Sequence, residues 1–263
     1  IRTPIHAIIG FAEIILKESL PENLSTQIEM IKDSSYSLLA IINDVLDLSK
    51  IESVRECAAE VALLLQNENS RLDGLFNNAG IINRNHRLTQ DGYENTLQVN
   101  FISPALLTLL LLPYMAANAH IVNMVSLTCR FGKVSSDLFH RAEKQFSQLG
   151  TYADTKLALL LFSIALHRHR EKLGMDNLHV NVADPGVVNS NMISMGRWFD
   201  GLADIFFRPF CSSPEKGVAP ALQALSTTKH CTYFVGKKHH PIAYRYQNNC
   251  NIDWLWSEIQ KMI

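Results

Sequence analysis

Before Gly74 the sequence contains a single glycine, Gly10. A turn that binds the phosphates of a dinucleotide needs several glycines directly after a first strand. They let the backbone approach the pyrophosphate closely at the N-terminus of a helix. The first part of this chain therefore cannot form such a turn.

Paired cysteines, excess charge and long apolar runs are also missing. The five cysteines are scattered, which argues against a disulfide frame or a zinc site and for reduced thiols inside a cell. The net charge of −1 gives no electrostatic footprint for nucleic acid. The chain does not open on the charged-then-apolar pattern of a signal peptide, so we expect none, although a lost N-terminal anchor stays open. The longest apolar stretch, residues 105–112, is far short of the ~20 residues of a membrane helix. We expect an intracellular protein, cytoplasmic or peripheral to a membrane, without a transmembrane segment. The basic residues 237–240 are predicted to form a solvated loop.

What the sequence does contain divides it into two parts. Its 263 residues, 47% of them hydrophobic and 19% charged, suit one globular domain with a small extra module. Residues 1–50 carry apolar side chains at spacings of three and four on both sides of a break at Pro21, which predicts an antiparallel helical hairpin. Such a hairpin is too thin to bury its apolar seam alone and needs a partner. We place the boundary between the hairpin, residues 1–50, and the second domain, residues 51–263, at this point.

From about residue 54 the pattern changes to strands that alternate with helices. Helices are predicted at residues 54–65, 89–115, 150–173 and 214–225, and strands at 72–76, 120–125, 178–182 and 232–235, the last strand of the chain. This alternation implies right-handed crossovers and a parallel sheet with helices on both faces. The fold class is therefore α/β, a doubly wound parallel sheet preceded by an α-helical hairpin.

Tyr152 and Lys156 lie four residues apart at the head of an apolar helical run, so both side chains face one side of the helix. A tyrosine hydroxyl, with a pKa near ~10, is a poor base at neutral pH, and an ammonium beside it lowers that pKa. The phenol can then exchange a proton with an alcohol or carbonyl oxygen as hydride moves. Ser126, at the end of a predicted strand, can orient the same oxygen. The alternative is chance, because Tyr-x-x-x-Lys occurs in many helices.

Further motifs accompany this set. They are Asn77-Asn78-Ala79-Gly80 after a strand, Asn100 inside the long helix, and Pro185-Gly186 after the next strand. In order and spacing, residues 50–240 resemble the short-chain dehydrogenase/reductase family, in particular its retinol dehydrogenase and WW-domain oxidoreductase branch. The resemblance implies an incomplete Rossmann-like sheet that lacks the N-terminal glycine-rich part. It also implies an oxidoreductase that interconverts an alcohol with a ketone or aldehyde by means of NAD or NADP.

The resemblance implies a role for each residue. Tyr152 would be the general acid/base, Lys156 would lower its pKa and bind the nicotinamide ribose, and Ser126 would orient the substrate oxygen. Asn100 would support a water-linked proton path to Lys156. The other cofactor contacts would come from Asn78, Ala79, Gly80, Pro185, Gly186 and Ser190. Residues 191–213 fall at the family's variable substrate lid, and their apolar side chains suggest a lipid-like alcohol or carbonyl substrate. Ordinary packing of an amphipathic helix is the alternative for that segment.

Residues 1–53 resemble a different family. The segments 1–13 and 41–52 are similar to the dimerisation and phosphoacceptor hairpin of sensor histidine kinases. The resemblance implies a homodimer through the hairpin. It also implies a phosphoacceptor histidine before Ile1, which we expect not to be part of this chain, so His6 is expected to be an ordinary histidine. The alternative functions are a signalling or dimerisation module and a non-catalytic fusion product, with the dehydrogenase activity lost in this form.

The join between the two parts can be interpreted in two ways. Residues 46–53 fit the end of the kinase-like hairpin, and they also fit the dehydrogenase segment in which an aspartate, here Asp47, contacts the adenine. The second role requires a strand before Asp47, whereas the spacing there predicts a helix. Without the front strands, the strand at residues 72–76 becomes an edge with unpaired amides. We expect the hairpin or a second chain to cover it.

Overall fold

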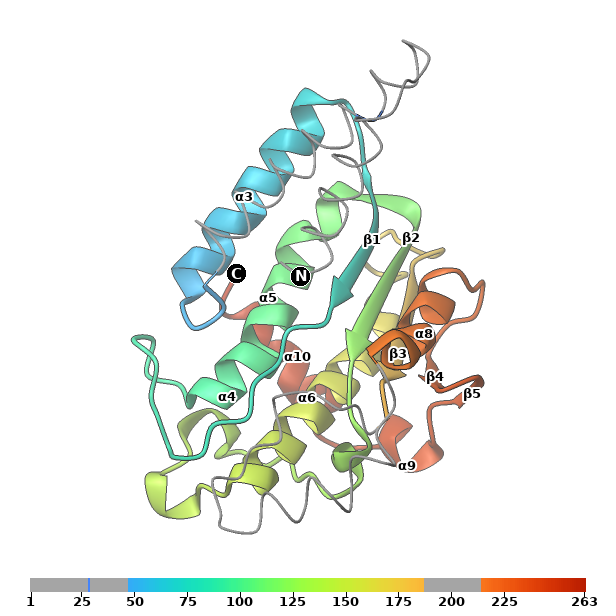
Figure 1. Cartoon of the computed structure of the whole chain (residues 1–263). Helices are drawn as coiled ribbons and strands as arrows, with labels where there is room; N and C mark the ends of the chain where they lie inside the picture. Colours follow the sequence, from blue (N-terminus) through green and yellow to red (C-terminus); the bar gives the residue numbers. More distant parts are fainter. Residues whose placement is uncertain (1–27, 29–46, 187–213) are drawn as a thin grey trace.

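The computed structural model describes residues 47–186 and 214–263 and, before them, Ile28 alone. Within these ranges the chain forms an α/β domain, as the sequence predicts (Figure 1). The predicted hairpin up to residue 46, the cofactor contact expected at Ser190 and the predicted substrate lid lie outside the described residues.

In the part of the chain that the structure describes, the sheet has five strands in the order β1-β2-β3-β4-β5. They are β1 (Leu72–Asn77), β2 (Met115–Met124), β3 (His179–Asp184), β4 (Thr232–Val235) and β5 (Lys238–Pro241). The first four are parallel, which confirms the predicted incomplete, Rossmann-like arrangement, and β5 is antiparallel to β4.

The strand β5 corrects one prediction. Residues 237–240 were predicted to be a solvated loop, and β4 was predicted to be the last strand. Instead, Gly236, with φ +56°, begins a tight turn, and the chain then pairs back along β4 as an edge strand. All four β5 residues are exposed, so the composition of this strand is that of a loop.

The helices follow the predicted order with shifted ends. They are α3 (Ile51–Asn67), α4 (Asn95–Leu97), α5 (Ser103–Leu111), α6 (Gln148–His169), α8 (Pro214–Leu225), α9 (Tyr244–Gln247) and α10 (Ile252–Gln260). The helix predicted at 89–115 begins only at Asn95, because Leu88 and Glu94 form a bridge and the Glu94 carboxylate caps the helix. It ends before β2, which starts at Met115. Likewise α6 ends before residue 173, and the sequence reading missed α9 and α10.

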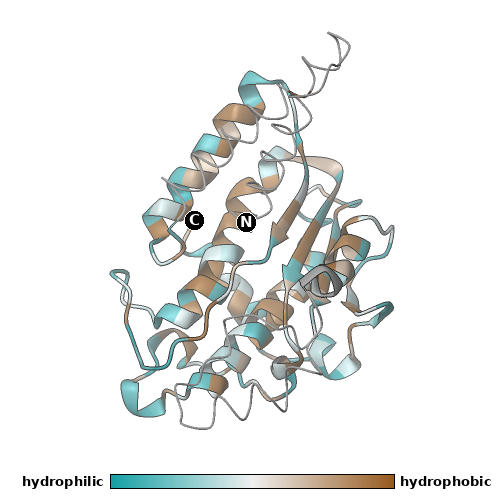
Figure 2. Cartoon of the chain, viewed as in Figure 1, coloured by the Kyte–Doolittle hydropathy of each residue, from teal (hydrophilic) through white to brown (hydrophobic). Residues whose placement is uncertain are grey.

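Helices cover both faces of the sheet, as predicted. On one face α8 packs on β2, β3 and β4, and on the other α6 packs on β2 and β3 (Figure 1). On that second side α3 packs on α5, and α10 packs on α6 and α5. Neighbouring residues of one strand face opposite layers. Ile121 belongs to the large core under α5 and α6, and Val122 belongs to the smaller core under α8. Figure 2 shows the apolar residues gathered between the sheet and these helices.

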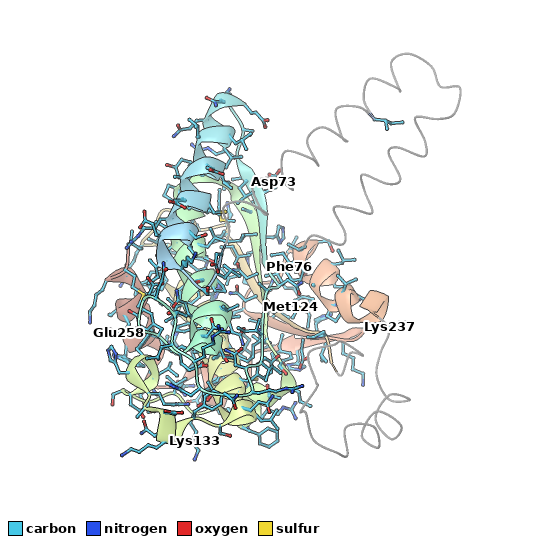
Figure 3. All side chains as sticks on the ribbon, turned by 60° about the vertical axis from the view of Figure 1, so that its left-hand side comes forward. Asp73, Phe76, Met124, Lys133, Lys237 and Glu258 are labelled. Atoms are coloured by element: carbon cyan, nitrogen blue, oxygen red, sulfur yellow. The ribbon has the colours of Figure 1, made fainter. Side chains whose placement is uncertain are left out.

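Among the described strands, β1 lies at one edge of the sheet, as predicted from the sequence. Leu72 and Leu75 pack toward the α3 and α5 side, whereas Phe76 packs toward α8. Figure 3 shows Asp73 and Phe76 along this strand. In the ranges that the structure describes, β1 pairs with β2 alone, so whether the N-terminal hairpin covers its other side stays a prediction.

Candidate functional site

The predicted site residues come from segments that follow the carboxyl ends of β1, β2 and β3, and from α6 beside them. The Asn77–Gly80 turn begins at the last residue of β1, Ser126 follows β2, and Pro185 and Gly186 follow β3. Figure 3 labels Met124 at the end of β2, where the site begins. Because parallel strands end at the same edge, chain segments far apart in sequence meet there.

Lys156 is buried, with 3% of its surface exposed. Its Nζ donates a hydrogen bond to the carbonyl oxygen of Met124 at 2.9 Å and lies 5.8 Å from the centroid of the Tyr152 ring. Burial lowers the pKa of Lys156 to about 8, and the negative charge of Asp184 acts in the opposite direction. The ammonium is therefore held inside the domain with one backbone acceptor and one nearby carboxylate.

Tyr152 is partly buried one helical turn before Lys156. Burial raises the pKa of Tyr152, a hydrogen bond with the Ser126 side chain lowers it, and the charge of Asp184 raises it again. From the sequence, the ammonium of Lys156 was expected to lower the pKa of Tyr152. The direction in the structure is upward, because burial of the phenol dominates.

Asn100 lies in a short π-helix, Gln98–Ile102, which interrupts the helix between α4 and α5. Its side chain is fully buried. The Oδ1 atom accepts from the backbone N–H of Ile81 at 2.7 Å, and the Nδ2 group donates to the Ile81 carbonyl at 2.9 Å and to Thr155 Oγ1 at 3.2 Å. π-Helical turns are rare and often mark functional sites. This turn ties the loop after β1 to α6.

Asn77, at the end of β1, and the residues that follow it have different surroundings. Asn77 is buried and donates to Thr108 Oγ1 at 2.9 Å and to Asn123 Oδ1 at 2.7 Å, whereas Asn78 is exposed. A Cβ on Gly80 would lie 3.3 Å from Lys156 Nζ and 3.5 Å from an oxygen of Asn100. Gly80 therefore lies next to Lys156 and Asn100. The hydrogen bonds of Asn77 hold the end of β1 against α5 and β2.

The segment after η3 (Leu127–Arg130) holds the N-terminal half of α6 in place. A Cβ on Gly132 would meet the Ala153 carbonyl oxygen at 2.4 Å, so only glycine allows this approach. The Asp154 carboxylate accepts from the Lys133 backbone N–H at 2.5 Å and pairs with Arg141. These contacts keep Tyr152 beside Ser126.

The Asp184-Pro185-Gly186 turn contains a buried acid that the sequence interpretation passed over. Asp184 is 1% exposed, and its carboxylate accepts from the Tyr233 hydroxyl at 2.7 Å and from the Gly186 backbone N–H at 2.8 Å. Gly186 has φ +70°, which favours glycine. The signal available in the sequence was an aspartate directly after an apolar strand and before Pro-Gly.

A pocket of about 490 Å³ lies beside this site. Asp47, Leu48 and Ser49 line one side and Ile81, Asn95 and Val99 another. Asp47 holds the turn, because its carboxylate accepts from the backbone and the hydroxyl of Ser49. Through Ile81, which is hydrogen bonded to Asn100, the pocket adjoins the Lys156 end of the site.

Comparison with known proteins supports two relationships. The chain is 36% identical to mouse polyprenol dehydrogenase over 179 residues, 65% of this chain and 52% of that protein. It is 31% identical to human retinol dehydrogenase 12 over 214 residues, 80% of this chain and 61% of that protein. The α/β part is therefore similar to members of the short-chain dehydrogenase/reductase family, as the sequence predicts. The chain spans about half the length of the curated relatives it matches.

Solved structures agree with the fold of a short-chain dehydrogenase/reductase. An uncharacterized protein from Mycobacterium paratuberculosis matches with a TM-score of 0.62 and 26% identity, over 82% of this chain and 73% of that one. The NADPH-bound carbonyl reductase from chicken fatty liver matches with a TM-score of 0.53 and 22% identity, over 81% and 83% of the two chains, and supports the fold alone.

The N-terminal residues match a second family. Residues 1–54 match the His Kinase A (phospho-acceptor) domain, which confirms the predicted relationship to histidine kinases. The match overlaps residues that the structure joins to the dehydrogenase part. The Leu48 carbonyl accepts from the Ser103 hydroxyl at 2.7 Å, and the Ile51 N–H donates to Asp91 at 2.8 Å.

Proposed function

We propose that the α/β part of this chain reduces an apolar aldehyde or ketone, and oxidises the corresponding alcohol, with a nicotinamide cofactor. The observation that carries the proposal is the convergence of Tyr152, Lys156, Ser126 and Asn100 at the carboxyl edge of the sheet. Burial holds the Tyr152 phenol in its protonated form, the form that donates a proton to a carbonyl oxygen. In this proposal Ser126, whose side chain lowers the pKa of Tyr152, orients that oxygen.

Lys156 and Asn100 support the same step. Lys156 keeps its position through the Met124 carbonyl, so its ammonium stays close to the phenol ring. Asn100 fixes the loop at Ile81 against α6 and lies beside Lys156, as the family's proton path requires. After each reduction, Tyr152 would regain its proton along the path through Lys156 and Asn100.

The residues present suit the nicotinamide end and the adenine end of NAD or NADP. They offer no glycine-rich turn for the pyrophosphate between these ends. When bound, the cofactor would supply or accept the hydride. Gly80 leaves space beside Lys156 that a Cβ would fill. In this proposal Pro185 and Gly186, which follow β3 at the same edge of the sheet, contact the nicotinamide. The pocket at Asp47 and Ile81 suits the adenine end. The pyrophosphate has no glycine-rich turn, since Gly10 is the only glycine before Gly74. We therefore expect weak cofactor binding and slow turnover, with NAD and NADP as alternatives.

The proposed substrate is a lipid-like alcohol or carbonyl compound. Relatives are named for polyprenol and retinol, both long apolar alcohols. The apolar residues between 191 and 213, at the expected lid, agree with that class.

We propose an intracellular location, cytoplasmic or peripheral to a membrane. Two described helical stretches, Asn95–Tyr114 and Gln148–His169, are long and apolar enough to cross a membrane. They are 89% and 83% buried within the domain, so core packing accounts for their composition.

The proposal is tested by following the absorbance of NADH and of NADPH with an apolar aldehyde such as retinal. The matched control is Tyr152→Phe, which keeps the ring and removes the hydroxyl. We expect aldehyde-dependent oxidation of one cofactor, and a rate at least about 100-fold lower in the variant, the usual contribution of a general acid. Equal rates in the two proteins would refute the proposal.

A second candidate function rests on the match of residues 1–54 to the phospho-acceptor domain. In this proposal the N-terminal segment dimerises the chain, and the dehydrogenase part is carried with it. Because Leu48 packs with α3 and α5, the segment to remove ends at residue 46 rather than 50. Size-exclusion chromatography should show a dimer that becomes a monomer on removal of residues 1–46. An unchanged oligomeric state would exclude this function.

A further inference from the structure

Asp184 is a buried acid directly behind the proposed site. Its carboxylate is 1% exposed and ends β3, one residue beyond Ala183, which pairs with Met124. Met124 is the residue whose carbonyl accepts from Lys156 Nζ. The Asp184 carboxylate therefore follows the residue that pairs with Met124, and the Met124 carbonyl holds the Lys156 ammonium from α6. An unpaired carboxylate at this depth would be strongly destabilising, so its partners identify its role.

Two neutral groups satisfy the carboxylate oxygens. The Tyr233 hydroxyl from β4 donates to one, and the backbone N–H of Gly186 donates to the other. Burial and the charge of Asp184 both raise the pKa of Tyr233, so its hydroxyl remains a donor at neutral pH. Neither bond neutralises the carboxylate. Its negative charge is left to act on the groups around it.

Those groups come from every element around the carboxylate. Lys156 and Tyr152 face it from α6, and the charge of Asp184 raises the pKa of both. Cys129, from η3, is buried, and its pKa is raised by that burial, so the thiol is neutral at neutral pH. Cys129 also contacts the Tyr246 hydroxyl of α9, whose pKa burial raises as well. Among the described groups on which the charge of Asp184 acts, Lys156 is the basic one.

We propose that Asp184 is a positioning residue that keeps the buried Lys156 side chain charged and fixes the Asp-Pro-Gly turn through Tyr233 and Gly186. The proposal deepens the proposed function, since Lys156 belongs to that site. Burial alone favours the neutral amine, and the carboxylate opposes it without contacting the reacting atoms. A neutral Lys156 would lose its attraction to the negatively charged form of Tyr152 that arises when the phenol gives up its proton.

The test is the titration of Lys156 in the whole chain, followed by NMR of carbon-13-labelled lysine side chains and independent of turnover. The Lys156→Met variant identifies its signal. Asp184→Asn keeps the size of the side chain and removes the charge. Tyr233→Phe keeps the charge and removes one hydrogen bond. Asp176→Asn removes an exposed aspartate at the other end of β3 and serves as the control.

We expect the Lys156 midpoint, about 8 in the natural chain, to fall by about one pH unit or more in Asp184→Asn. Tyr233→Phe and Asp176→Asn should leave it within about 0.3 of that value. If Asp184→Asn does not fold, Asp184→Ser, which is smaller and also uncharged, makes the same comparison. An unchanged midpoint in the uncharged variant would overturn the proposal. A shifted midpoint in a chain without turnover would support this role of Asp184 while refuting the proposed enzyme activity.

Discussion

Replacing Lys156 by methionine should make the folded chain more stable at neutral pH. The side chain is 3% exposed, and burial lowers its pKa from 10.5 to about 8. At about 1.4 kcal/mol per pKa unit, keeping this ammonium charged inside the domain reduces the free energy of unfolding by about 3 kcal/mol. Methionine has a similar length and no charge. Loss of the hydrogen bond to the Met124 carbonyl offsets about 1 to 2 kcal/mol of the gain. The expected net stabilisation is about 1 to 2 kcal/mol.

The pH dependence gives a second, independent signature. Because the folded pKa of Lys156 lies below the unfolded value, the unfolded chain binds more protons between pH 8 and 10.5. Stability of the natural chain therefore rises with pH through this window on account of Lys156, by up to about 1.4 kcal/mol per pH unit. Buried cysteines such as Cys129, whose pKa is raised, act in the opposite direction above about pH 9. They are present in both proteins and cancel in the difference.

The assay is urea unfolding followed by tryptophan fluorescence, at several pH values from 7 to 10, for the natural chain and the variant. The advantage of Lys156→Met should be largest at pH 7 and shrink as the pH rises above 8. Lys172→Met, which removes an exposed lysine, should show neither effect. A variant that is less stable at pH 7, or a difference that does not change with pH, would refute the reasoning.

Three further substitutions test the packing that supports the site, each by its effect on urea unfolding. Gly132→Ala should destabilise the chain by about 2 kcal/mol, because its Cβ would meet the Ala153 carbonyl at 2.4 Å, whereas Gly74→Ala, with contacts of 3.6 Å, should change little. Asn77→Ala should lose about 2 kcal/mol, since it leaves the buried Asn123 amide oxygen without its donor, and Asn78→Ala, at an exposed position, should be within about 0.5 kcal/mol of the natural chain. Arg141→Met should lose about 3 kcal/mol by leaving Asp154 without its cation, and Lys261→Met, from a solvent-exposed pair, less than about 1 kcal/mol. Equal effects within any pair would contradict the assigned contact.

The order of elements could be predicted from the sequence where the local pattern and the tertiary contacts agree. The buried strands β3 and β4 are short runs with apolar residues between turn residues, so their position followed from composition. The exposed strand β5 has no apolar pattern, and it exists because Gly236 turns the chain back onto β4. The start of the helix at Asn95 depends on the bridge between Leu88 and Glu94, which no helical spacing reveals.

The site could be predicted in part for the same reason. Tyr152 and Lys156 lie on one helix, and their fixed spacing is visible in the sequence. The contact of Asn100 with Ile81, and the burial of Asp184 against Tyr233, join segments that lie far apart in the chain. Only the assembled sheet brings these pairs together. The upward direction of the Tyr152 pKa likewise depends on burial, which the sequence alone does not state.

The central proposal is that this chain still binds the nicotinamide cofactor although it lacks a glycine-rich turn. The most direct test is a titration of the whole chain with NADH and with NADPH, following the cofactor fluorescence, beside the Lys156→Met variant. We expect saturable binding of at least one cofactor with a midpoint below about 1 mM, weakened or lost in the variant. No saturation of either cofactor at millimolar concentration, or equal binding by the variant, would contradict the claim.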